Sequence, residues 1–331
     1  MRPFFEAQST LVARLLGEGD ALAHALLLAG GPGVGKRRTA EALAQGLLCE
    51  TPLAERHDGL ACGACPGCHW FEAGNHPDFR PMELMVKDGK LAWEISIDQV
   101  RELEEFAAMS AFRGGARVVL VDPAETLSVP AANALLKMLE EPGRRTWFLL
   151  VTHRPDSLPA TVRSRCRQVP VPAPATAEQQ RWLVAETGVA PEEAARLVTW
   201  SGGAPLHARH LADPSNLTAY RRLLEAFASL PETGSVAVAD AVATAGVEQW
   251  YPLLQRWVSD LARVSAGAPP RFFADSAPRL AQLRQRSSLA GLARASAGLQ
   301  RQATLLRHPL NPRLLLEASL ELYLDAFRNR T

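Results

Sequence analysis

The sequence has little excess charge of either sign and few lysines. Its 36 basic and 35 acidic residues leave a formal net charge of +1, and only four of the basic residues are lysines. A nearly neutral chain is not a generally basic nucleic-acid binder, because phosphate backbones are bound by an excess of positive charge. Any contact with DNA or RNA must therefore come from a local patch or through partners.

Long apolar runs are also absent. No stretch approaches the ~20 apolar residues that cross a bilayer, and the N-terminus lacks the apolar centre of a secretion signal. We therefore expect a cytoplasmic protein without a membrane partner. With 331 residues, of which 47% are hydrophobic, the chain is long enough for two or three domains, each with its own core.

Cysteine is scarce outside one cluster. Four of the five cysteines follow the spacing C-x12-C-x2-C-x2-C: Cys49, Cys62, Cys65 and Cys68. Four thiolates suit tetrahedral Zn²⁺, and because the protein supplies all four ligands, the predicted site is structural rather than hydrolytic. Two alternatives remain, namely buried cysteines without a metal, and His69 or His76 as substitute ligands.

A glycine-rich segment at residues 30–36 follows a short apolar run, residues 25–29, and precedes a helical pattern. This strand, loop and helix order is that of a phosphate-binding loop, in which Gly30, Gly35 and Lys36 would surround phosphates. Arg37 stands where a Ser or Thr hydroxyl would bind Mg²⁺. Arginine has no lone pair for a cation, so the site is expected to be empty or to bind nucleotide weakly.

Asp122 follows a buried-type strand at residues 117–121, and a second such strand is predicted at 147–151. An acid at this end of a parallel strand holds Mg²⁺ in many nucleotide-hydrolysing enzymes, and a following Glu often polarises the attacking water. Here the next residue is Pro123, and Glu125 comes two positions late. Asp122 alone is equally compatible with a turn cap; together with the loop it indicates a degenerate nucleotide site.

Two more motifs complete a recognisable set: residues 133–142, Asn-Ala-Leu-Leu-Lys-Met-Leu-Glu-Glu-Pro, and the triplet Ser164-Arg165-Cys166. With the loop and the four-cysteine insertion directly after its helix, they resemble the clamp-loader branch of the AAA+ proteins, most closely the delta-prime subunits of bacterial DNA polymerase III. The specific motifs lie in the N-terminal half, while the remainder is similar in its helical character.

The resemblance implies a fold class and a domain plan. It implies an α/β AAA+ domain at residues 1–168, a parallel sheet between helices, with the zinc module at 49–68. A small helical lid domain at 169–212 and an all-α collar domain at 213–331, which joins subunits in a ring, would follow. A Pro-rich stretch at residues 168–177 is the expected boundary after the first domain.

A role for Arg165 follows from the same resemblance. In the family, this arginine is a finger that reaches the ATP of a neighbouring gamma or tau subunit, with Ser164 and Cys166 completing the motif. ATP would then be bound by the neighbour rather than by this chain. The implied partners are the gamma/tau and delta subunits and, through the complex, the sliding clamp and primer-template DNA.

Our leading interpretation is a non-hydrolysing clamp-loader subunit that acts in DNA replication and is not an enzyme on its own. Two alternatives remain open: an active motor ATPase of the gamma type, and a zinc-dependent DNA-binding module on a vestigial ATPase fold. Turnover of ATP by the isolated chain would favour the first. Loss of DNA binding on zinc chelation would favour the second.

Overall fold

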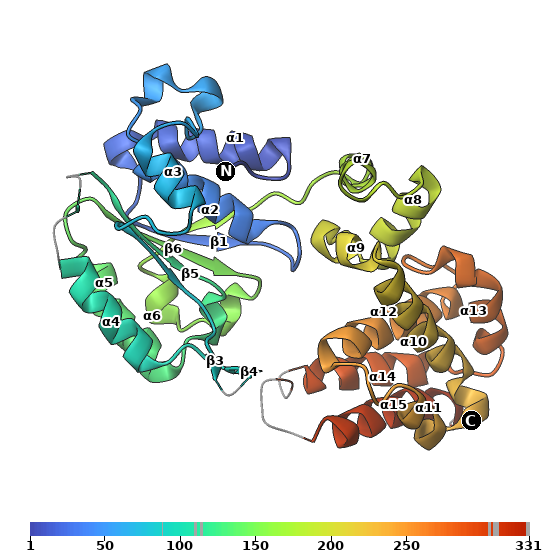
Figure 1. Cartoon of the computed structure of the whole chain (residues 1–331). Helices are drawn as coiled ribbons and strands as arrows, with labels where there is room; N and C mark the ends of the chain where they lie inside the picture. Colours follow the sequence, from blue (N-terminus) through green and yellow to red (C-terminus); the bar gives the residue numbers. More distant parts are fainter. Residues whose placement is uncertain (88, 109–110, 113–114, 304–305, 307–310, 329–331) are drawn as a thin grey trace. The chain divides into compact units, whose positions relative to one another are not determined.

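The computed structural model describes residues 1–87, 89–108, 111–112, 115–303, 306 and 311–328 (Figure 1). The chain divides into two compact units, Met1–Glu178 and Gln179–Thr331. The predicted division into three domains at residues 168 and 212 remains a prediction. Among the described residues, no helix combines the length and apolar character needed to cross a bilayer.

A five-stranded parallel sheet forms the centre of the first unit, with the strand order β2-β5-β6-β1-β7. The strands are β1 (Ala25–Ala29), β2 (Phe79–Met82), β5 (Arg117–Val121), β6 (Thr146–Thr152) and β7 (Arg167–Pro170). A separate two-stranded hairpin pairs β3 (Val86–Lys87) with β4 (Lys90–Leu91). The predicted parallel α/β sheet is therefore confirmed.

Helices cover both faces of this sheet (Figure 1). They are α1 (Glu6–Gly17), α2 (Lys36–Leu48), α3 (Pro66–Glu72), α4 (Ile97–Ala108), α5 (Val129–Glu140) and α6 (Ala160–Arg163). In β1, Leu26 and Leu28 pack with α1 and α2, whereas Leu27 packs with α4, α5 and α6. Because both faces are buried, the central strands need continuous apolar runs, which is why they were predictable.

The parallel pairing fixes two opposite edges of the sheet. Ala29, at the end of β1, pairs with Thr152 at the end of β6, and Val121 of β5 pairs with Leu150 of β6. The segments that follow β1, β5 and β6 therefore leave from one edge, which we call the carboxyl edge. The segments that enter these strands lie at the other, the amino edge.

The second unit is helical in its described part. It contains α8 (Pro191–Trp200), α9 (Pro205–Leu211), α10 (Pro214–Thr233), α11 (Ser235–Ala241), α12 (Val247–Ser265), α13 (Ala277–Arg284), α14 (Leu289–Gln302) and α15 (Pro312–Arg328), while α7 (Thr176–Thr187) begins just before its first residue. Its core centres on Trp257, whose indole N–H donates to the Tyr323 hydroxyl at 2.9 Å. The expected all-helical remainder is present.

Asp260 ties the segment after α12 to that helix. Its fully buried carboxylate accepts hydrogen bonds from the backbone N–H groups of Arg271, Phe272 and Phe273 at 2.7, 2.8 and 2.8 Å. We expect Asp260→Ala to lower the free energy of unfolding by roughly 3 kcal/mol, because the N–H groups lose their acceptor. Urea unfolding followed by circular dichroism measures this change in the free energy of unfolding.

The matched control for this prediction is Asp325→Ala. Asp325 is 56% exposed and pairs with Arg328 at 3.4 Å, so its loss should cost less than about 1 kcal/mol. Equal unfolding midpoints for the two variants would contradict the structural role of Asp260.

Candidate functional site

The glycine-rich segment forms the predicted loop between β1 and α2, at the carboxyl edge. Gly33 and Gly35 have φ values of 69° and 99°, a left-handed conformation that L side chains rarely adopt. The Lys36 ammonium group is mostly buried and donates to the Gly31 carbonyl at 2.7 Å. Burial lowers the pKa of Lys36, while the carboxylates of Glu125 and Asp122 oppose this shift. The Lys36 ammonium group is thus hydrogen-bonded within its own loop.

Arg37 lies beside Asp122. Its guanidinium is 3.6 Å from the Asp122 carboxylate, 2.9 Å from Glu41, and hydrogen-bonded to Glu83. Burial raises the pKa of Asp122, whereas the charge of Arg37 lowers it. The positive charge of the Arg37 guanidinium therefore lies beside Asp122, the acid that would bind Mg²⁺ in a nucleotide-hydrolysing enzyme with such a site. The Thr39 side chain is fully buried, and its hydroxyl donates to the Gly35 carbonyl at 3.0 Å.

Glu125 and His153 form a hydrogen-bonded pair that the sequence analysis missed. The Glu125 carboxylate, 4% exposed, lies 3.0 Å from His153 Nε2 and accepts the His153 backbone N–H at 3.3 Å. Burial would raise the pKa of Glu125, but the hydrogen bonds with His153 and other donors outweigh it and lower this pKa to about 2. Such a carboxylate is a weak general base at neutral pH. The available signal was that His153 comes two positions after the strand predicted at residues 147–151.

Arg165 lies far from this loop, at the amino edge. It precedes β7, in which Arg167 pairs with Leu26 and Pro170 pairs with Ala29 of β1. The loop begins after Ala29, so the five residues of β1 separate the two sites by about 15 Å, at roughly 3.3 Å per residue. Arg165 therefore cannot serve the loop of its own chain.

The three residues of the predicted motif have different surroundings. The Arg165 side chain is 35% exposed, donates from Nε to Glu140 at 2.7 Å, and donates from one terminal nitrogen to the Thr161 carbonyl at 3.0 Å. The Ser164 hydroxyl donates to the same carbonyl at 3.1 Å. Cys166 is buried in the core, and burial raises its pKa to about 11. Of the three, Arg165 alone presents charge at the surface; their catalytic assignment remains a prediction.

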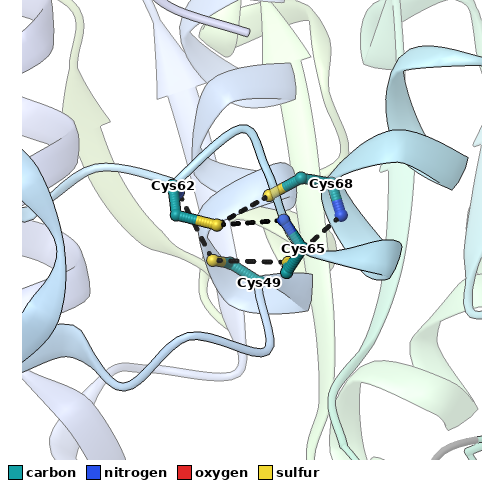
Figure 2. Close-up of side chains that lie close together, drawn as sticks. All are labelled: Cys49, Cys62, Cys65 and Cys68. Carbon is teal, nitrogen blue, oxygen red and sulfur yellow. Dashed lines mark hydrogen bonds between the residues drawn. The ribbon is translucent and has the colours of Figure 1, made fainter.

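Four cysteines come together where α2 ends and α3 begins (Figure 2). Their sulfur atoms all lie within 4.8 Å of one another, and the Cys62–Cys68 and Cys49–Cys65 pairs are 3.9 Å apart. A tetrahedral zinc with bonds of ~2.3 Å would separate sulfurs by about 3.8 Å. The described residues contain no other such group, and neither His69 nor His76 belongs to it.

The backbone around the cluster also fits a metal bound by thiolates. Sulfur accepts backbone N–H groups at 3.3 to 3.4 Å, including Cys65 N–H to Cys62 and Cys68 N–H to Cys65. A hydrogen bond from Thr51 contributes most to a Cys62 pKa of about 6, whereas burial raises the pKa of Cys49 and Cys68. A cation offsets the cost of burying charged thiolates. These four residues could therefore hold a metal ion such as zinc.

Arg56 stabilises the segment that carries the first of the four cysteines. Its guanidinium donates to the carbonyls of Gly46 at 2.7 Å and Cys49 at 3.0 Å, and its Nε donates to Thr51 at 2.7 Å. The first two carbonyls belong to the last turn and cap of α2, where helix carbonyls lack intrahelical partners. Arg56 thus fixes the chain that carries the first cysteine.

Comparisons with known proteins agree with these features. A family model described as "DNA polymerase III, delta subunit" matches residues 8–175. The DNA polymerase III subunit delta' of Pseudomonas aeruginosa is 42% identical over 212 residues, covering 64% of this chain and 62% of that protein. Its counterpart in Escherichia coli (strain K12) is 35% identical over 254 residues, covering 77% and 68%. The match thus spans less than two thirds of the Pseudomonas protein.

The fold has a counterpart among solved structures. A DNA polymerase III gamma subunit-related protein from Thermotoga maritima has a TM-score of 0.50 and 18% identity, covering 97% of this chain and 100% of that one. At this identity the likeness concerns the fold alone. With the family match and the Escherichia coli relative, the chain belongs to the delta-prime (delta') subunit family of DNA polymerase III.

Proposed function

We propose that this chain is a non-hydrolysing subunit of the DNA polymerase III clamp loader, which lends Arg165 to the ATP site of a neighbouring gamma or tau subunit. The observation that carries the proposal is the position of Arg165 at the amino edge, with its guanidinium partly exposed, on the opposite side of the sheet from its own loop. Because Arg165 is too far from its own loop, it could contact only a phosphate that is bound by another chain.

The loop at the carboxyl edge supports the non-hydrolysing part. Arg37 contributes a positive charge beside Asp122 and no oxygen ligand, so Mg²⁺ would meet repulsion and an incomplete coordination shell. Pro123 has no group that accepts a proton, and the carboxylate of Glu125 is engaged by His153. Gly30, Gly35, Lys36 and Asp122 are therefore the remnant of a nucleotide site that is empty or binds weakly.

The chemistry of arginine supports the role in trans. A guanidinium is permanently charged and forked, and it stabilises the charge that spreads over the transferred phosphoryl group. Ser164 and Cys166 would place it, the first through the Thr161 carbonyl and the second by burial in the core. ATP itself would be bound by the neighbour.

The remaining assignments follow from this role. Cys49, Cys62, Cys65 and Cys68 would hold a structural Zn²⁺ that supplies bonds between the end of α2 and the start of α3. The partners would be gamma/tau and delta and, through the complex, the sliding clamp and primer-template DNA. We propose that the lid (169–212) and collar (213–331) lie in the helical remainder, and that the protein works in the cytoplasm.

ATP turnover by the purified chain tests this proposal. We expect no phosphate release above that of a protein-free control, with or without primed DNA, because the loop lacks a magnesium ligand and a base. Turnover that Lys36→Ala abolishes would instead support a motor ATPase of the gamma type. DNA binding that is lost on zinc chelation would support the DNA-binding alternative.

A further inference from the structure

We propose that Glu140 is a positioning residue for Arg165, an inference that rests on the proposed function. The Glu140 carboxylate accepts a hydrogen bond from Nε of the Arg165 guanidinium at 2.7 Å, and the same oxygen forms an ion pair with one terminal nitrogen. The other terminal nitrogen donates to the Thr161 carbonyl at 3.0 Å. Glu140 and Thr161 therefore hold the guanidinium from two helices, α5 and α6.

A count of donors shows what remains available. Arginine has five N–H groups, one on Nε and two on each terminal nitrogen. Glu140 accepts the Nε hydrogen, and the Thr161 carbonyl accepts one hydrogen from a terminal nitrogen. Of the three that remain, one is on the nitrogen bonded to Thr161, with the Ser164 hydroxyl at a long 3.5 Å, and two are on the other terminal nitrogen, which forms the ion pair with Glu140. Both terminal nitrogens therefore keep an N–H group that suits an oxygen of one phosphoryl group.

Contacts at both ends of helix α5 fix the position of Glu140. At its start, the Ser128 hydroxyl accepts the Ala131 N–H at 3.3 Å, and Leu135 and Leu139 are buried in the core. At its end, His24 Nε2 contacts the Leu139 carbonyl at 2.9 Å. A side chain on such a helix end holds its partner more precisely than one on a loop.

The placement of Glu140 is electrostatically costly without Arg165. It is the last residue of α5, followed by Glu141, and carboxylates are unfavourable at the negative end of a helix. The Arg165 guanidinium offsets this charge for Glu140. No ion pair is present for Glu141 in the described part of the chain, which makes it the matched control on the same helix end.

The test uses the complex reconstituted with gamma/tau, delta, clamp and primed DNA. We expect Glu140→Ala to lower kcat for ATP at the adjoining site about tenfold, because a loosened finger spends less time in its productive geometry. The KM for ATP and the assembly of the complex should be unchanged. Glu140→Gln, which keeps an oxygen acceptor for Nε, should restore much of the rate, and Glu141→Ala should behave as wild type.

A second comparison separates this inference from the proposed function. In an Arg165→Ala background, Glu140→Ala should have no further effect, because it acts only through the missing side chain. If Arg165→Ala itself leaves the rate unchanged, the proposed function fails. If Arg165→Ala lowers the rate but Glu140→Ala matches Glu141→Ala, raises the rate, or lowers it further without Arg165, the positioning role is overturned.

Discussion

Replacing Arg165 by alanine is expected to slow ATP hydrolysis at the adjoining site of the reconstituted complex by roughly 10³-fold, the scale on which arginine fingers act. The substitution removes the only charged donor of the Ser164-Arg165-Cys166 segment. Its main contacts are a single carboxylate, which is 49% exposed, and one backbone carbonyl. The chain should therefore fold and assemble normally. Single-turnover ATPase measurements with clamp and primed DNA, alongside gel filtration, resolve the two effects.

Two control variants make this result specific. Arg163→Ala removes a nearby arginine that pairs with Asp156 at 2.7 Å within its own chain, and it should leave the rate within about twofold. Arg165→Lys keeps the charge but loses the fork, so an intermediate rate is expected. An unchanged rate for Arg165→Ala in a fully assembled complex would remove this residue from the mechanism.

Loss of one of the four clustered cysteines should have the largest effect on structure. In Cys68→Ser, we expect zinc content to fall well below one ion per chain and residues 49–72 to become sensitive to protease, because structural zinc supplies folding energy directly. Small zinc peptides bind the metal with an apparent ~10–16 kcal/mol at neutral pH. Elemental analysis, limited proteolysis and the thermal midpoint measure the three consequences.

Cys166→Ala is the matched control for the zinc prediction. Cys166 is buried among the core residues that contact α4, α5 and α6, outside the four-cysteine group. Its substitution should leave zinc content unchanged and cost only the packing of one sulfur atom. Full zinc content in Cys68→Ser would show that its thiolate is not required to hold the metal.

The sheet was predictable where burial dictates composition. The apolar run predicted at residues 25–29 is β1, Ala25–Ala29, and the strand predicted at 147–151 lies within β6, Thr146–Thr152. Strands buried on both faces must be apolar throughout, and such runs are visible in a sequence. The order in which strands pair was not visible, because pairing partners depend on packing between segments far apart in the chain.

The candidate site was predictable as a set of residues and only partly as a geometry. The cysteine spacing correctly predicted that four sulfurs come together. The contact of Arg37 with Asp122 was not predicted, because it joins segments that follow two strands separated in the sheet by a third. The Glu140–Arg165 pair joins positions 25 residues apart in the sequence. To predict such contacts, one must know at which edge of the sheet each segment lies.

Arg37 has a consequence for how this subunit responds to its surroundings. A magnesium ion can dissociate or be removed by a chelator, whereas a guanidinium on α2 is covalently part of the protein and stays with Asp122 and Glu83. The carboxyl edge of this sheet should therefore keep one arrangement whatever the concentrations of free magnesium and adenine nucleotides. In the proposed complex, where a neighbouring gamma or tau subunit would bind and release ATP, such a subunit would provide a constant surface.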